Sequence, residues 1–165
     1  MNTTGRIYQR KVLAIASQGG HWVQLRRLRA AWDGCRTTYV CTNAGYRQEV
    51  AETEPSAEFQ AIPDANMTTK LRLVLQALHV LMIVLRVRPD AIVTTGAAPG
   101  YFALRIGRMI GARTVWVDSI ANGQELSLSG RKAGRYAGLW LTQWEHLAEP
   151  AVKPGSGPRF QGAIL

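Results

Sequence analysis

The chain has 165 residues, 47% of them hydrophobic, and it carries a formal net charge of +9 with an isoelectric point near 10.3. This length and apolar content predict one folded domain with its own core and argue against intrinsic disorder. The basic charge favours anionic partners: a phosphorylated substrate, an anionic membrane face or nucleic acid.

The first predicted elements are a strand and a helix. Residues 11–16 are apolar and run into a glycine turn, which is typical of a strand buried in a sheet. Residues 21–32 predict an amphipathic helix, because their apolar side chains recur on one face while Arg26 and the neighbouring arginines lie largely off it. Gly34 is a natural stop for this helix.

Two further strands follow. They are predicted at 37–42 and 58–62, and the polar segment 45–55 between them predicts an irregular stretch or a short helix. Cys35 and Cys41 flank or lie in the first of these strands. We expect both to be reduced core thiols, since two cysteines cannot form a disulfide scaffold and their spacing does not suit a metal.

A long helix is predicted to begin at Thr68 or Thr69, either of which can cap it, and to run to about Val87. It is apolar almost all round, with one narrow polar stripe formed by Arg72, Gln76, His79 and Arg86. Such a helix either packs deeply in a protein or lies against lipid, and packed helices of this kind are the more common. Its longest unbroken apolar run, 80–85, is too short to span a membrane.

Strands and helices keep alternating in the rest of the chain. The predicted strands are 91–95, 113–118 and 139–143, and the predicted helices between them are 101–110 and 129–137. Strands alternating with helices at this spacing form βαβ units. The sequence therefore predicts an α/β fold with a parallel sheet flanked by helices on both faces.

Three polar turns fall at the carboxyl ends of predicted strands, the edge at which open parallel sheets bind ligands. They are 17–21, 95–100 and 118–125. The first two lead into helix starts whose free amides can bind a phosphate or a sugar hydroxyl, although the second can also be a plain connection. The glycines that would let a ligand approach are Gly19, Gly20, Gly96 and Gly100. The first turn lacks the third glycine and the following acid of a dinucleotide site, so no nicotinamide cofactor is expected.

His21 is the candidate for acid–base chemistry. It stands at a helix start, where the positive helix end favours a neutral imidazole that can act as a base or a hydrogen-bond acceptor. The alternative is that His21 only caps and packs its helix. His79 and His146 are expected to be structural.

The third turn opens a polar segment that continues to Lys132. Asp118 and Glu125 can serve as a base or bind a hydroxyl, and Arg131 and Lys132 can meet a diphosphate. The alternative is a solvated loop in which Ser129 caps the next helix.

Several of these segments occur in an order and spacing that resembles a known family. They are Ser-Gln-Gly-Gly-His at 17–21, the glycine turn at 94–100, the polar run at 116–129 with Glu-Leu-Ser-Leu-Ser-Gly at 125–130, and Leu-Thr-Gln-Trp at 141–144. Together they resemble the acceptor-side subunit of two-chain glycosyltransferases. That family includes PssD-type subunits of bacterial exopolysaccharide synthesis and the membrane-associated subunit of the eukaryotic enzyme that adds the second N-acetylglucosamine to dolichol-linked oligosaccharide.

The resemblance implies a Rossmann-like GT-B N-terminal half-domain over residues 1–150 and a partner-docking tail over 151–165. The implied partner is a small catalytic subunit that binds a UDP-sugar, and the two chains together resemble the one-chain enzyme MurG. The implied reaction transfers the sugar, with inversion, to a polyprenyl-diphosphate-linked acceptor in polysaccharide or oligosaccharide biosynthesis. No metal or cofactor is expected, and the chain alone is expected to be inactive.

The resemblance also implies roles for single residues. Carried onto this sequence, the two glycine loops and the histidine that line the acceptor's diphosphate and reaction centre fall on Gly19, Gly20, His21, Gly96 and Gly100. His21 is the first candidate for the base and Glu125 is the second. The remaining candidates for acceptor and diphosphate binding are Ser127, Ser129, Arg131 and Lys132.

The location and the alternatives follow from the same features. The polar first ten residues carry no apolar signal core, and the chain is expected to lack the membrane span of the eukaryotic members. We therefore expect a cytoplasmic protein held peripherally at the inner face of the cell membrane by its charge and its long apolar helix. A non-catalytic membrane scaffold that recruits the transferase is the main alternative. Nucleic-acid binding is not expected, because RNP-type aromatics and zinc-finger spacing are lacking.

Overall fold

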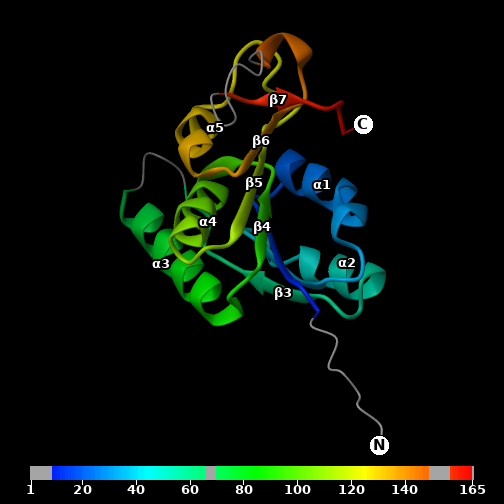
Figure 1. The fold of residues 1–165 in the computed structure, drawn as a ribbon. Coiled ribbons are helices and arrows are strands. Elements are labelled where there is room, and N and C mark those ends of the chain that lie inside the picture. Colours follow the sequence, from blue (N-terminus) through cyan, green and yellow to red (C-terminus); the bar gives the residue numbers. More distant parts are fainter. Residues whose placement is uncertain (1–8, 66–69, 149–156, 165) are drawn as a thin grey trace, which may run out of the picture.

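Seven parallel strands form a single sheet in the residues that this computed structural model describes, which are 9–65, 70–148 and 157–164 (Figure 1). In sheet order they are β3 (Glu58–Ala61), β2 (Arg36–Cys41), β1 (Lys11–Ala16), β4 (Ala91–Thr94), β5 (Arg113–Val117), β6 (Leu139–Thr142) and β7 (Arg159–Phe160). The helices are α1 (Gly20–Arg27), α2 (Tyr46–Thr53), α3 (Lys70–Val87), α4 (Ala97–Met109) and α5 (Leu128–Ala133). The α/β fold with a parallel sheet that the sequence predicts is confirmed.

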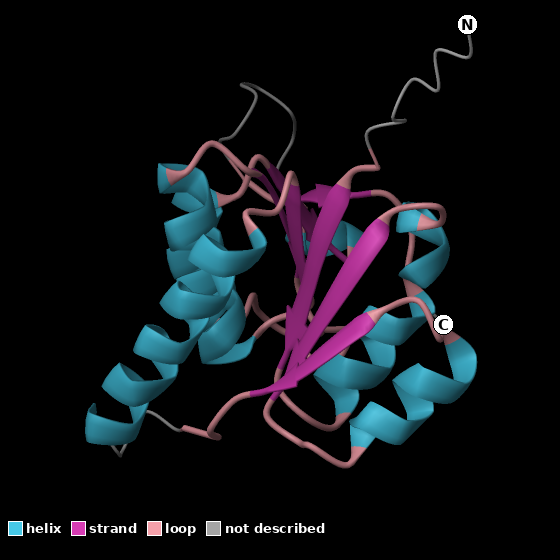
Figure 2. Cartoon of the chain, turned by 90° about the horizontal axis from the view of Figure 1, so that it is seen from below, coloured by secondary structure: helices cyan, strands magenta, loops and turns pink. Residues whose placement is uncertain are grey.

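Helices cover both faces of the sheet (Figure 2). Helices α3, α4 and α5 lie on one face, and α1 and α2 lie on the other (Figure 1). Alternate residues of the central strand β1 pack on opposite faces of the sheet, because successive side chains of a strand point to opposite sides. Leu13 and Ile15 belong to the core under α3 and α4, whereas Val12 and Ala14 belong to the core under α1.

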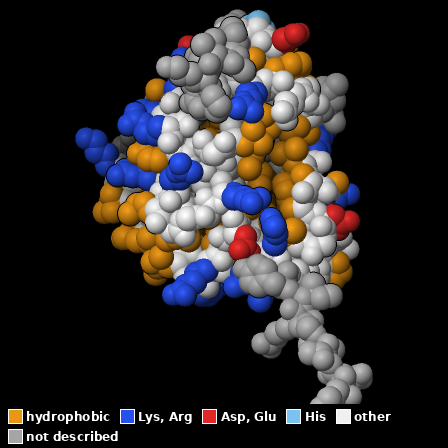
Figure 3. Space-filling model, viewed as in Figure 1, with side chains coloured by type: hydrophobic (Ala, Val, Ile, Leu, Met, Phe, Trp, Pro, Cys, Tyr) orange, Lys and Arg blue, Asp and Glu red, His pale blue; other side chains and the backbone are white. Residues whose placement is uncertain are grey.

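One part of the sheet has no helix over it among the described residues. On the face that carries α1, strands β5 and β6 present Val115, Leu139 and Leu141, which are only partly buried. These side chains line a groove of about 1130 Å³, with Arg88 and Arg113 also along it. Figure 3 shows hydrophobic side chains gathered there between lysine and arginine side chains. This exposed face is unusual, because parallel sheets are normally covered on both sides.

The helix predicted at 21–32 divides in two. Helix α1 ends at Arg27, and a 3₁₀ helix follows at Arg29–Trp32. The expectation that Arg26 lies off the packed face is wrong, since only 6% of it is exposed and its guanidinium pairs with Glu49 and Glu54 of the α2 region. The side chain of Arg26 is therefore part of the contact that holds α1 against α2.

Helix α4 begins four residues before its predicted start at 101. The predicted turn at 95–100 shortens to Thr95 and Gly96, and the φ angles of Gly96 and of the first helix residue, Ala97, are 134° and 64°. Pro99 is compatible with this early start, because the first turn of a helix leaves its backbone N–H groups without helical partners. The chain thus passes from β4 into α4 with almost no intervening loop.

Helix α3 is buried on one side and exposed on the other. Its buried side consists of Gln76, Val80, Ile83 and Val84. Gln76, expected in the polar stripe, is fully buried and donates a hydrogen bond from Nε2 to the Pro63 carbonyl over 2.8 Å. The exposed side carries Leu71, Val74, Leu75, Leu78, Met82 and Leu85. No helix in the described ranges has the length and apolar character needed to cross a membrane, and the predicted caps at Thr68 and Thr69 lie outside those ranges.

The end of the chain adds a strand that the sequence does not predict. Residues 159 and 160 form β7, which pairs in parallel with β6 so that Thr142 lies opposite Phe160. The remaining residues 151–156 and 165 of the expected tail lie outside the described part of the chain. At least part of this tail is therefore integrated into the sheet.

Candidate functional site

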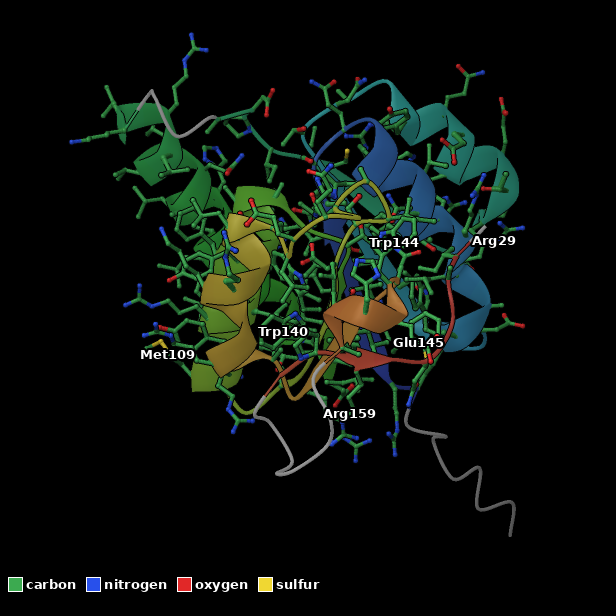
Figure 4. The ribbon with its side chains drawn as sticks, turned by 90° about the horizontal axis from the view of Figure 1, so that it is seen from above. Arg29, Met109, Trp140, Trp144, Glu145 and Arg159 are labelled. Carbon is green, nitrogen blue, oxygen red and sulfur yellow. The ribbon has the colours of Figure 1, made fainter. Side chains whose placement is uncertain are left out.

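The three predicted polar turns meet at one edge of the sheet. Strand β1 pairs with β4 and β4 pairs with β5, so the carboxyl ends of these three strands are neighbours. The turns that follow them begin at Ser17, Thr95 and Asp118. Figure 4 looks onto this edge and labels Trp144, which follows β6. Residues distant in the sequence are thus brought together where a ligand is expected.

His21 contacts the second turn directly. Its Nδ1 lies 2.8 Å from the carbonyl oxygen of Thr95, and the Thr95 hydroxyl donates to the carbonyl oxygen of His21 over 2.6 Å. A carbonyl oxygen only accepts, so a neutral imidazole bound in this way carries its hydrogen on Nδ1. Within the described residues Nε2 has no hydrogen-bond partner. The free nitrogen of His21 is therefore a hydrogen-bond acceptor at the carboxyl edge.

Gly96 makes this position of His21 possible. A Cβ atom at residue 96 would lie 2.7 Å from Cε1 and 2.8 Å from Nδ1 of the imidazole. The φ angle of 134° at Gly96 is also one that other residues rarely adopt. The sequence suggested that Gly96 admits a ligand, and the structure adds that it admits the side chain of His21.

The glycines of the first turn lie in open surroundings. A Cβ at Gly19 or Gly20 would meet nothing within 4 Å, and both residues are exposed. No side chain caps the start of α1, although the Gly19 amide already donates to the Tyr46 hydroxyl over 3.3 Å. The first-turn amides of α1 thus face space in which an anionic group can be bound.

Gly100 has a different environment. It lies in the first turn of α4 and is buried against β4, where a Cβ would come within 2.1 Å of Thr94 Oγ1. The structure therefore gives Gly100 a packing role, since it lets α4 approach the sheet closely.

Asp118 organises the third segment. Only 2% of it is exposed, and its Oδ1 accepts hydrogen bonds from the Ser119 amide at 3.0 Å and the Asn122 side chain at 2.9 Å. Its Oδ2 accepts from the Ser127 amide at 3.0 Å. Both oxygens of the Asp118 carboxylate, which the sequence offers as a base or a hydroxyl binder, thus bind groups of its own loop. Gly130 completes this arrangement, since a Cβ there would lie 2.6 Å from Asp118 Oδ2.

Glu125 lies on the exposed part of the same loop. Its carboxylate pairs with Arg131 over 3.1 Å, and their side chains are 76% and 48% exposed. Such a pair contributes little to stability and can be exchanged for another charge. Glu125 makes no hydrogen bond or ion pair with His21 in the part of the chain that the structure describes.

The remaining candidates lie around α5. Ser127, and not Ser129 as expected, caps this helix, since its Oγ accepts from the Gly130 amide over 2.9 Å. The reason is that α5 begins at Leu128, one residue before the predicted start. Ser129 is partly buried, and Lys132 is exposed without an ion pair to any described residue. Across the described ranges, no three His, Cys, Asp or Glu side chains cluster as a metal site requires.

Two residues of this edge escaped the sequence interpretation. They are Gln24 and Gln143, which are buried beneath the turns. Gln24 falls on a helix that also carries polar residues on its outer face, so it does not stand out in the pattern. Gln143 lies in the Leu-Thr-Gln-Trp segment at 141–144, but the sequence assigns it no role.

Comparisons with known proteins relate the chain to solved structures. No protein-family model matches the chain, and no curated protein matches it. MurG from Acinetobacter baumannii is 13% identical with a TM-score of 0.67, and the match covers 92% of this chain and 45% of MurG. A glycosyltransferase from Rickettsia africae ESF-5 is 11% identical with a TM-score of 0.64, covering 93% of this chain and 43% of that one.

An epimerase is also similar. UDP-GlcNAc 2-epimerase from Methanocaldococcus jannaschii is 10% identical with a TM-score of 0.61, covering 80% of this chain and 39% of the epimerase. The chain thus spans less than half the length of these structures. At such low identity the likeness establishes the fold, which is a Rossmann-like sheet corresponding to the N-terminal half of GT-B proteins.

Proposed function

We propose that this chain is the acceptor-side half of a glycosyltransferase that moves a sugar from a UDP-sugar to a polyprenyl-diphosphate-linked acceptor. The observation that carries the proposal is the geometry of His21. Its Nδ1 is held by the Thr95 carbonyl, and its Nε2 is free at the carboxyl edge of a sheet that resembles half of MurG. This is the arrangement that a general base needs, because the fixed nitrogen orients the ring and the free one accepts a proton.

The chemistry follows from that free nitrogen. Nε2 of His21 takes the proton of the acceptor hydroxyl while the hydroxyl oxygen forms a bond to C1 of the donor sugar. The bond between C1 and the diphosphate oxygen breaks on the opposite face, and its electron pair leaves with UDP, so the sugar is inverted. The open first-turn amides of α1 can bind the acceptor's diphosphate and hold the hydroxyl near the imidazole.

The need for a second chain is supported by the uncovered sheet face. Val115, Leu139 and Leu141 form a partly exposed apolar surface of a kind that parallel sheets normally cover. In this proposal a small nucleotide-sugar-binding subunit docks beside the sheet and covers His21. The segment after β6, which includes β7, is the other expected contact with this subunit.

Attachment to a membrane is supported by the outer side of α3. Six apolar residues of this helix are at least 44% exposed, and the helix contains no acidic residue. Arg72 and Arg86 are exposed on the same helix. Apolar side chains next to cations suit the surface of an anionic membrane, where the lipid-linked acceptor would be found.

The test of the function is sugar transfer by the chain together with its partner. The chain is co-expressed with a candidate small subunit that binds a nucleotide sugar, and transfer from a UDP-sugar to a short polyprenyl-diphosphate sugar is followed. We expect His21→Ala to lower kcat by roughly 10²–10⁴-fold, as loss of a general base does, while His79→Ala on α3 keeps full activity. A complex in which His21→Ala and Glu125→Ala both retain full transfer would show that the chain is a scaffold.

A further inference from the structure

Two buried amide side chains connect the turns of the carboxyl edge. Gln24 of α1 is 6% exposed, and Gln143, directly after β6, is 4% exposed. Nε2 of Gln143 donates to Oε1 of Gln24 over 2.6 Å, although the two residues lie 119 positions apart. Burying two amides is favourable only when their hydrogen bonds are made, so the other partners of this pair decide what it does.

Gln24 makes every hydrogen bond that its side chain can make. Its Nε2 donates to the Gly20 carbonyl at 3.2 Å and to Ser119 Oγ at 3.0 Å, and its Oε1 also accepts from the Ile120 amide at 3.0 Å. The Gly20 carbonyl can only accept and the Ile120 amide can only donate, which fixes the orientation of the side chain. Gln24 therefore holds the residue before His21 and the start of the third segment at once.

Gln143 adds another bond to the third segment and connects one further segment to it. Its Nε2 donates a second bond to the carbonyl oxygen of Asp118 over 2.9 Å, and its Oε1 accepts from the Ile164 amide over 2.8 Å. Residues 159–164 are thus connected through Gln143 and Gln24 to the turn that carries His21. Trp144 adds a bond from Nε1 to the Ile120 carbonyl over 2.8 Å, so this part of the third segment is held from both sides.

Folding alone does not require this amide pair. Replacing both partners of a buried hydrogen bond by apolar side chains of similar size can be nearly neutral for stability. What the pair does fix is the distance between the first turn and the third. Its bonds end on Gly20 in the first turn and on Asp118, Ser119 and Ile120 in the third. A shift of about 1 Å in such a site can lower turnover by roughly 10²-fold.

We propose that Gln24 and Gln143 are positioning residues that set His21 against the third segment, and that residues 159–164 act on His21 through Gln143. The catalytic meaning of this inference rests on the proposed function, while the structural coupling does not. In this proposal the glutamine pair positions the imidazole of His21 from the side of Gly20. The Thr95 carbonyl, bonded to Nδ1, holds the ring from the other side.

The coupling is tested in the chain alone by NMR of the His21 ring, assigned with a His21→Asn variant. Ile164→Pro removes the amide that Gln143 accepts from, whereas Ile164→Ala keeps it. We expect the Hε1–Cε1 resonance of His21 and the Ile120 amide resonance to shift in Ile164→Pro and to stay in place in Ile164→Ala. Unchanged resonances in Ile164→Pro would overturn the coupling of residues 159–164 to His21.

The catalytic part is tested in the two-chain complex with Gln24→Leu, Gln143→Leu and the double variant. We expect kcat to fall about 10- to 100-fold with an unchanged KM for the UDP-sugar, since the donor site is not altered. Gln48→Leu, at an exposed glutamine on α2 whose side chain bonds only to Glu52 among the described residues, is the control and should keep full activity. Full kcat in the folded double variant would refute the positioning role. Shifted His21 resonances in a complex that transfers no sugar would instead refute only the proposed function.

Discussion

The imidazole of His21 lies against the backbone of Gly96, where a side-chain carbon would come within 2.7 Å of Cε1. This contact connects the first turn to the second across strands β1 and β4. Any side chain at residue 96 would therefore displace the imidazole of His21, the candidate base.

Replacing Gly96 by alanine should displace His21. We expect turnover of the two-chain complex to fall by roughly 10²-fold or more, because the hydrogen bond from Nδ1 to the Thr95 carbonyl cannot form beside the new methyl group. Gly111→Ala is the matched control, since Gly111 also has a positive φ, of 81°, but no atom within 4 Å of a new Cβ. Equal losses in both variants would mean that backbone strain, and not the contact with His21, is responsible.

Replacing Gly100 by alanine should affect stability. The new Cβ would overlap Thr94 Oγ1, so α4 must move from β4, and we expect a loss of about 1–3 kcal/mol in the free energy of unfolding. Urea titration measures this loss. Adding Thr94→Ala should recover part of it, because the closest atom is removed. An additive double variant would contradict the packing role.

Replacing Arg26 by methionine should destabilise the fold by about 2–4 kcal/mol. Its side chain is 8% exposed, and its removal leaves Glu54, 24% exposed, without its cation. Arg36→Met is the matched control, because the pair of Arg36 with Glu58 is 58% and 44% exposed and should contribute less than about 1 kcal/mol. Chemical unfolding of both variants measures the two losses in the free energy of unfolding. Equal losses would contradict the idea that the buried ion pair contributes more than the exposed one.

The phenol of Tyr39 should ionise only at a pH well above that of an ordinary tyrosine. Burial raises the pKa of Tyr39 to about 12, above the ordinary value of about 10 for an unfolded chain. The neutral phenol is the favoured form in the fold, so its contribution to stability is complete below about pH 10 and declines as the pH rises towards 12. Absorbance at about 295 nm should show a phenol that ionises only as the pH approaches 12, and Tyr39→Phe should remove that step.

Charges placed on the outer side of α3 should weaken membrane binding. We expect Leu78→Glu together with Met82→Glu to lower sedimentation with anionic vesicles by about 10-fold or more, since both side chains are roughly half exposed and replace apolar contact by repulsion. Val23→Glu on α1 is the control, because its side chain is 47% exposed on another helix. Equal vesicle binding by the unchanged protein, the α3 double variant and Val23→Glu would show that α3 does not contact the membrane.

The sequence predicts the fold well where a strand is a continuous run of buried apolar residues. Strand β1 is apolar at every residue after Lys11, and such runs alternating with helical segments leave little choice but a parallel sheet. The start of α4 could not be predicted in the same way. Its sequence, Gly-Ala-Ala-Pro-Gly, favours a turn, and only the tertiary contacts around Gly96 and Ala97 impose positive φ angles and begin the helix early.

The site was predictable in part for a related reason. Turns at the carboxyl ends of strands can be located from the strand pattern, so His21 and the glycines beside it are found without a structure. Hydrogen bonds between distant polar residues follow no sequence period. The Gln24–Gln143 bond and the hydrogen bonds of Asp118 to its own loop are therefore visible only when the strands are in place.

The bond between Ile164 and Gln143 has a practical consequence for handling the protein. Residues inserted close to Ile164 would lie next to that bond, which leads through Gln143 and Gln24 to the turn that carries His21. A tag placed ahead of β1 would lie at the opposite, amino-terminal edge, where Lys11 begins the strand. A preparation with residues inserted close to Ile164 is therefore the one in which a displaced His21 should first be attributed to the insertion.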